Sequence, residues 1–160
     1  MALSDVQAVF FTADTNAADV ASVSANERPN TSFTIGGTDT SGGVATFSAG
    51  RIITCTTTGT GDSGKTVTIT GTDVNGDAQT EVITLPGSAT TTAGTKYFRT
   101  VTAAEASTQP AANVSIGMSG AAGDVIFAGR SRLKGVFTVN SATAGVVNFT
   151  NASPAGTALM

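Results

Sequence analysis

Two stretches of the chain contain residue types whose spacing could bind a phosphate group or a metal ion. Residues 59–66 read Gly-Thr-Gly-Asp-Ser-Gly-Lys-Thr, which matches the phosphate-loop pattern of nucleotide-binding proteins letter for letter. In such a loop a helix begins at the lysine, and its first amide groups hold the phosphate. Here Thr66 opens an alternating run, Thr66–Thr72, that is typical of a strand. The sequence therefore predicts a hairpin loop at this position and no nucleotide site.

The second stretch is the run Asp73, Asn75 and Asp77, whose side-chain oxygens are ligands that calcium prefers. An EF-hand loop requires glycine at its sixth position and glutamate at its twelfth, and this sequence has Ala78 and Thr84 there. Asp and Asn are also the ordinary turn formers, and an Asn-Gly pair provides the left-handed dihedral angles of a tight hairpin. We expect a turn held by backbone chemistry, so no metal or cofactor is assigned and these residues remain a weak calcium candidate.

Side chains for common catalytic arrangements are scarce. The chain has no histidine, which excludes a Ser-His-Asp triad and a histidine-based zinc site. Cys55 lies in an apolar strand pattern, where a cysteine is usually inert core. Glu81 and Glu105 have no obvious partner in the sequence. We therefore expect no catalytic residue and no enzyme activity.

The composition is poor in charge and rich in threonine. Only 12% of the residues are charged, against about 25% in an average domain. Threonine favours strands and keeps the outer face of a sheet polar. A β protein rich in threonine and poor in charge is typical of structural or adhesive modules. The net charge of −3 argues against a nucleic-acid partner, because phosphate contacts need clustered lysine and arginine. We expect no secretory signal and no membrane span, since the N-terminus lacks a basic region and a long apolar run.

Short alternating runs with glycine-rich corners recur about every ten residues from Thr31 onward. The strands expected from this pattern are 31–35, 44–48, 51–58, 66–72, 79–85, 96–102 and 113–118. Residues 103–106, which are rich in alanine, could make one helical turn. The pattern predicts an all-β fold, an antiparallel β-sandwich or barrel of short strands with an extended N-terminal arm.

Three segments are expected along the chain. Residues 1–30 are weakly patterned and form the arm, and residues 31–120 form the β-sandwich domain. Residues 121–160 form a C-terminal β-strand segment. Its last strand, 157–160, begins after a turn and stops after four residues. Either a neighbouring subunit completes that strand or the chain continues as the start of a second β unit.

Two groups of residues are candidates for partner contacts. The first group is the apolar side chains of the arm, Val6, Val9, Phe10 and Phe11, which are too few to fold alone but enough to pack on a partner. The second is the one basic cluster, Arg130, Arg132 and Lys134. This cluster either guards a solvated strand edge with charge or contacts an acidic protein surface.

A longer pattern resembles virion structural proteins of tailed bacteriophages. It contains the strand 43–47, the Thr-Gly-Thr-Asp-x-x-Gly corner within 66–77, the Glu-bearing strand 80–85 and the aromatic strand 96–101. An Ala/Gly-rich segment follows, so the resemblance covers residues 43–118, and 132–160 look like the β-rich C-terminal part of similar proteins. Members of that group include capsid decoration (cement) proteins, fibres and tail components, and the resemblance implies a place in the virion and no activity.

The resemblance leads to an expected function. We expect a decoration protein that binds and stabilises the lattice of the major capsid protein, in a virion assembled in the bacterial host cytoplasm. A homotrimer is expected because charge-poor edges, an apolar arm and an unfinished last strand all favour contacts between copies. The alternatives are a phage tail, neck or fibre component, and a secreted bacterial adhesion or sugar-binding module. The absence of a signal and of tryptophan counts against the secreted module.

Overall fold

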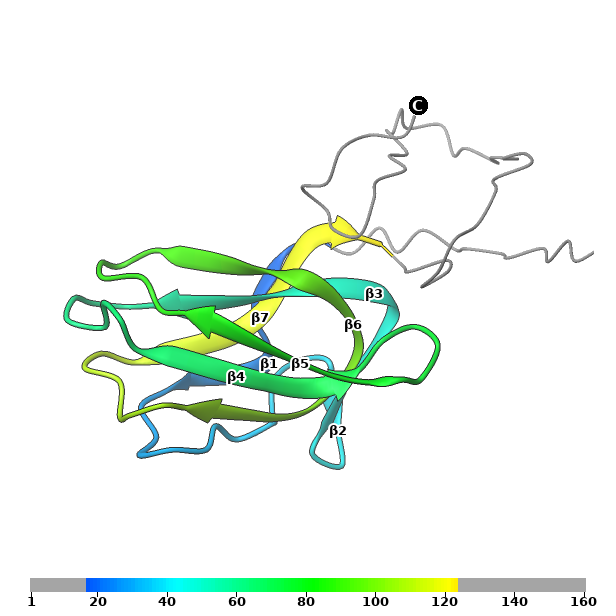
Figure 1. Cartoon of the computed structure of the whole chain (residues 1–160), viewed down its shortest axis with the longest axis horizontal. Coiled ribbons are helices and arrows are strands. Elements are labelled where there is room, and N and C mark those ends of the chain that lie inside the picture. Colours follow the sequence, from blue (N-terminus) through cyan, green and yellow to red (C-terminus); the bar gives the residue numbers. More distant parts are fainter. Residues whose placement is uncertain (1–16, 124–160) are drawn as a thin grey trace, which may run out of the picture.

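Strands form where threonine alternates with apolar residues. In β4 (Thr66–Thr72), Val67 and Ile69 are fully buried while the threonines between them stay half-exposed. A computed structural model describes residues 17–123, which form one antiparallel sheet of seven strands (Figure 1). The other strands are β1 (Asp19–Glu27), β2 (Thr40–Ser41), β3 (Val44–Thr57), β5 (Ala78–Thr84), β6 (Thr91–Ala106) and β7 (Val114–Ala122). The strand order is β1-β7-β3-β6-β4-β5, and β2 pairs with β3.

Two long strands fold this sheet into two layers. β6 pairs with β3 through residues 91–101 and with β4 through residues 100–106, and register shifts interrupt both ladders. Such irregularities bend a strand and increase its twist. The sheet therefore curls over, with β1, β7 and β3 in one layer and β4 and β5 in the other (Figure 1). The all-β antiparallel prediction is confirmed, and the arrangement is consistent with a β-sandwich because the sheet does not close into a barrel.

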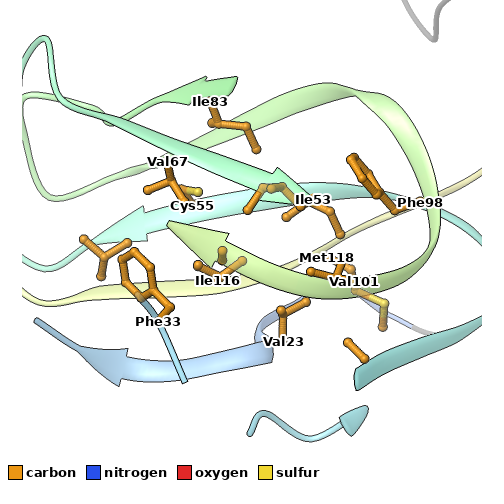
Figure 2. Close-up of a cluster of buried hydrophobic side chains, with 14 of the residues drawn as sticks. Val23, Phe33, Ile53, Cys55, Val67, Ile83, Phe98, Val101, Ile116 and Met118 are labelled. Atoms are coloured by element: carbon orange, nitrogen blue, oxygen red, sulfur yellow. The ribbon is translucent and has the colours of Figure 1, made fainter. Parts of the chain in front are cut away.

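The core lies between the two layers and draws side chains from nearly every strand (Figure 2). Ile53, Ile69, Phe98, Val101 and Ile116 are each fully buried in it. Phe33 enters from the segment before β2 and is 5% exposed. These contacts join residues far apart in the sequence, so the fold depends on long-range packing.

Part of the predicted N-terminal arm belongs to the sheet. Residues 19–27 form β1, which pairs antiparallel with β7. The strand carries small residues such as Ser22 and Ser24, both buried, and this hid its pattern from the sequence. The contact between β1 and β7 requires small residues, since a Cβ placed on Gly117 of β7 would lie 2.0 Å from the carbonyl oxygen of Asp19. The close approach of the β1 and β7 backbones therefore favours small residues, and β1 lacks the alternating large apolar residues that mark the other strands.

Two local predictions were wrong. Residues 31–35 form no ladder strand; the segment lies across two strands, with the Phe33 amide donating to Ala104 O at 2.9 Å and the Gly36 amide to Val23 O at 3.1 Å. Residues 103–106 are the end of β6 and not a helical turn. Ala104 and Ala106 face the core in alternation, so packing overrides the helix preference of alanine. The two strands predicted next, 44–48 and 51–58, do lie in a strand, because they merge into the single long strand β3.

Candidate functional site

The phosphate-loop-like stretch connects β3 to β4 without a helix. It is also not the predicted hairpin loop, because β3 and β4 are not neighbours in the sheet and β6 lies between them. Lys65 Nζ donates to Asp62 Oδ1 at 3.2 Å and to Gln109 O at 3.0 Å. The lysine that would contact a nucleotide is therefore engaged in holding its own loop to the loop between β6 and β7.

Asp62 is the centre of this loop contact. Its carboxylate is fully buried and accepts hydrogen bonds from the amides of Ala111 and Ala112. Burial alone would raise the pKa of Asp62, but the two amide donors and the Lys65 ammonium outweigh that effect and hold the pKa below its ordinary value. An ionised carboxylate with these donors fastens two loops together, which is a structural task.

The weak calcium candidate forms the turn of the β4–β5 hairpin. Asp73 Oδ1 accepts the amides of Asn75 at 2.8 Å and Asp77 at 3.0 Å, and the Gly76 amide donates to Asp73 O. Gly76 has a φ of 86°, the left-handed value that the Asn-Gly pair predicts. Asp73 Oδ1, the side-chain oxygen that faces the turn, therefore already accepts two backbone amides. Within residues 17–123, no three Asp, Glu, Cys or His side chains gather closely enough to hold a metal ion.

Replacing Gly76 with valine is expected to lower the free energy of unfolding by at least about 1 kcal/mol, because a β-branched residue is strained at this φ. Thermal unfolding of the variant measures the loss. Addition of a chelator to the parent protein is expected to leave the melting temperature unchanged. A fall of several degrees in chelator that calcium reverses would establish a metal site at the turn.

Cys55 and Glu81 point into the interior from facing strands. Burial and, to a smaller extent, the nearby charge of Glu81 raise the pKa of the Cys55 thiol to about 12. The thiol is therefore a core group, as its sequence context predicts. Glu81, for which the sequence offered no obvious partner, accepts hydrogen bonds from the amides of Thr95 and Lys96 and from Thr95 Oγ1. It ties β5 to the irregular part of β6, so it too is structural.

The remaining candidate is the outer face of β4 and β5, hereafter the threonine face. Its side chains alternate with the buried ones of the two strands and contain no charged group. They are Thr66, Thr68, Thr70 and Thr72 on β4, and Ala78, Thr80, Val82 and Thr84 on β5. Val82 is 63% exposed. The register places Val82 beside Thr68, and Thr68 beside Glu105, the acidic residue at the β6 border of this face.

The threonine face is suited to contact with a flat protein surface. It offers hydroxyl and methyl groups in regular rows, and no charge has to be removed from water when a partner covers it. The sequence contains the signal for this face in the alternation of 66–72, although the two partner-binding groups were expected elsewhere. Val6, Val9, Phe10, Phe11, Arg130, Arg132 and Lys134 lie outside the described residues.

Comparisons of the chain with protein-family models, with curated proteins and with solved structures find no match. In the part of the chain from 17 to 123, no helix is long and apolar enough to cross a membrane. The functional proposal therefore rests on the chain's own residues and on the pattern they resemble.

Proposed function

We propose that the chain is a non-enzymatic structural protein of a tailed-bacteriophage virion, and specifically a capsid decoration protein that binds and stabilises the lattice of the major capsid protein. The observation that carries the proposal is the threonine face, an uncharged sheet surface with an exposed valine at its edge. The resemblance of residues 43–118 to virion proteins supplies the class of partner. The proposal includes a homotrimer, with residues 1–16 lying on the capsid.

The polar groups in the interior support a structural function. Asp62, Lys65, Glu81 and Asp73 each satisfy backbone groups of this chain, so they are engaged in holding loops and strands. A protein of this kind offers a rigid surface and no reactive group. The second candidate is a tail, neck or fibre component, which the same face and the same resemblance also favour. A secreted adhesion or sugar-binding module fits less well, since Tyr97 is the one residue of the tyrosine and tryptophan type.

Binding of the purified protein to capsids that lack it tests the proposal. The double variant Thr68→Glu/Thr80→Glu is expected to bind roughly tenfold more weakly or worse, because two carboxylates would be buried against the partner. Thr60→Glu is the matched control, since Thr60 is exposed in the β3–β4 loop and lies off the face. Equal affinity of the double variant and the parent would contradict docking through the threonine face.

The same assay tests the arm. Deletion of residues 1–16 removes Val6, Val9, Phe10 and Phe11 but keeps β1, so the sheet is expected to stay folded while occupancy on capsids falls. Circular dichroism of the truncated protein controls for folding. Electron microscopy of intact particles then separates the two candidates, because a decoration protein adds density on the shell and a tail or fibre component does not.

A further inference from the structure

β5 is the last strand of the sheet order, so one of its edges pairs with no described strand. It pairs with β4 on one side, and no other described strand pairs with it. An open edge exposes unpaired amide and carbonyl groups to another chain. Native proteins usually protect such an edge with charge, bulges or proline. β5 has seven residues, contains no proline and keeps an unbroken register with β4.

The hydrogen bonds at the two ends of the hairpin define which residues of β5 face outward. The Asp73 amide donates to Asp77 O at one end, and the Leu85 amide donates to Lys65 O at the other. Bonded and non-bonded pairs alternate along an antiparallel ladder, so the odd-numbered residues of β5 bond to β4. The backbone groups of Thr80, Val82 and Thr84 therefore point to the open edge.

Within the described residues, β6 contacts the first half of β5, where Gln79 Nε2 donates to Tyr97 O and Glu81 accepts the amides of Thr95 and Lys96. One further contact reaches an outward backbone group. Lys96 Nζ donates to Thr80 O at 2.7 Å, which agrees with an outward-facing carbonyl. A carbonyl oxygen accepts two hydrogen bonds, so this contact leaves room for a second donor. The other outward groups, including both backbone groups of Val82, have no hydrogen bond to described residues. The contacts with β6 are thus confined to residues 79–81, in the first half of β5.

The exposed edge is self-complementary. A twofold contact requires that residue i meet residue j and that j meet i. The outward residues of β5 read Ala, Thr, Val, Thr, and the last three are symmetric about Val82. When two copies of β5 pair antiparallel about Val82, the two valines lie opposite each other and each Thr80 lies opposite a Thr84. Aliphatic and Thr–Thr cross-strand pairs are favourable, and no like charges meet.

We propose that β5 pairs antiparallel with β5 of a second copy of this chain, with Val82 opposite the partner's Val82. The amide of each Val82 then donates to the carbonyl of the other, and the two threonine faces join into one continuous surface. The contact uses none of residues 1–16 or 121–160. It therefore stands independently of the proposed capsid binding and of the proposed trimer, and it would link neighbouring copies in any assembly.

Cysteine cross-linking tests this register directly. Opposite residues in a bonded antiparallel pair have Cα atoms about 5.5 Å apart, within disulfide range. Val82→Cys is expected to form a disulfide-linked dimer under mild oxidation. Thr80→Cys alone is expected to form none, whereas a mixture of Thr80→Cys and Thr84→Cys forms the mixed dimer. The native Cys55 is fully buried and does not compete.

Val20→Cys is the matched control, because Val20 of β1 is 51% exposed and lies away from the β5 edge. Cross-linking of Val82→Cys no faster than Val20→Cys would overturn the proposal. So would Thr80→Cys alone reacting as fast as the mixture. Adding Val82→Lys to both partners of the mixture is expected to slow cross-linking about fivefold through like charges, and pairing Val82→Lys with Val82→Glu is expected to restore it.

Discussion

Replacing Asp62 with alanine is expected to lower the free energy of unfolding by roughly 3 kcal/mol, because two amides and the Lys65 ammonium lose their buried acceptor. Lys65→Ala is expected to cost less, since the lysine side chain is 24% exposed and its loss leaves the amide bonds of Asp62 in place. Urea unfolding of each variant measures the difference. Asp77→Ala is the control, because this exposed carboxylate accepts no hydrogen bond from a described residue, and a change within about 0.5 kcal/mol is expected.

The contribution of Asp62 is expected to depend on pH in one direction. Its folded-state pKa lies below 3.8, the ordinary value that applies in the unfolded chain. The stabilisation is therefore fully present above 3.8 and is lost as the pH falls through the folded-state pKa. The difference in stability between the parent and Asp62→Ala should stay constant at higher pH and shrink only in acid. A difference that grows as the pH falls would refute an ionised Asp62.

Replacing Glu81 with alanine is expected to lower the free energy of unfolding by about 2–4 kcal/mol. The change leaves the amides of Thr95 and Lys96 without an acceptor at the irregular part of β6. Glu81→Gln keeps one acceptor oxygen and is expected to cost less. Glu105→Ala is the matched control, since this residue of β6 is exposed and its carboxylate accepts no hydrogen bond from a described residue.

A double-mutant cycle with Gly94 makes the test specific to this contact. A Cβ on Gly94 would lie 2.4 Å from Glu81 Oε2, so Gly94→Ala forces the carboxylate away from its donors. Gly94→Ala is therefore expected to cost clearly less in the Glu81→Ala background than in the parent. Costs that simply add would show that Glu81 and Gly94 act independently. The hydrogen bonds of Glu81 would then not be what holds β5 to β6.

The parts of the fold that the sequence predicted well are those with strong local signals. The strand 66–72 was predicted with its observed bounds because threonine and aliphatic residues alternate there without interruption. The turn that follows was recognised from Asn75-Gly76, and Gly76 takes the expected positive φ. A hairpin needs only neighbouring residues, so its pattern is readable from a short window.

The parts that the sequence missed depend on partners far along the chain. β6 extends well beyond 96–102 at both ends, because Thr92 pairs with Cys55 and Ala104 pairs with Ile69. Small residues have weak local preferences, and these distant pairings decide their conformation. The same holds for Asp62, whose donors Ala111 and Ala112 lie in another loop. A carboxylate on the apolar face with Ile83 was itself a signal that Glu81 has a buried partner.

The pairing of β1 with β7 has a consequence for the newly made chain. β1 ends at Glu27 and β7 begins at Val114, so a ribosome adding 5–20 residues per second needs on the order of ten seconds between them. During that interval β1 lacks β7, and the described segment already available to it is 36–39, whose amides donate to carbonyls of β1. Its buried positions include Ser22 and Ser24 where another strand would have large aliphatic side chains. We therefore expect the small polar residues of β1, which weaken its sequence signal, to lower the tendency of this segment to aggregate with other nascent chains before β7 is made.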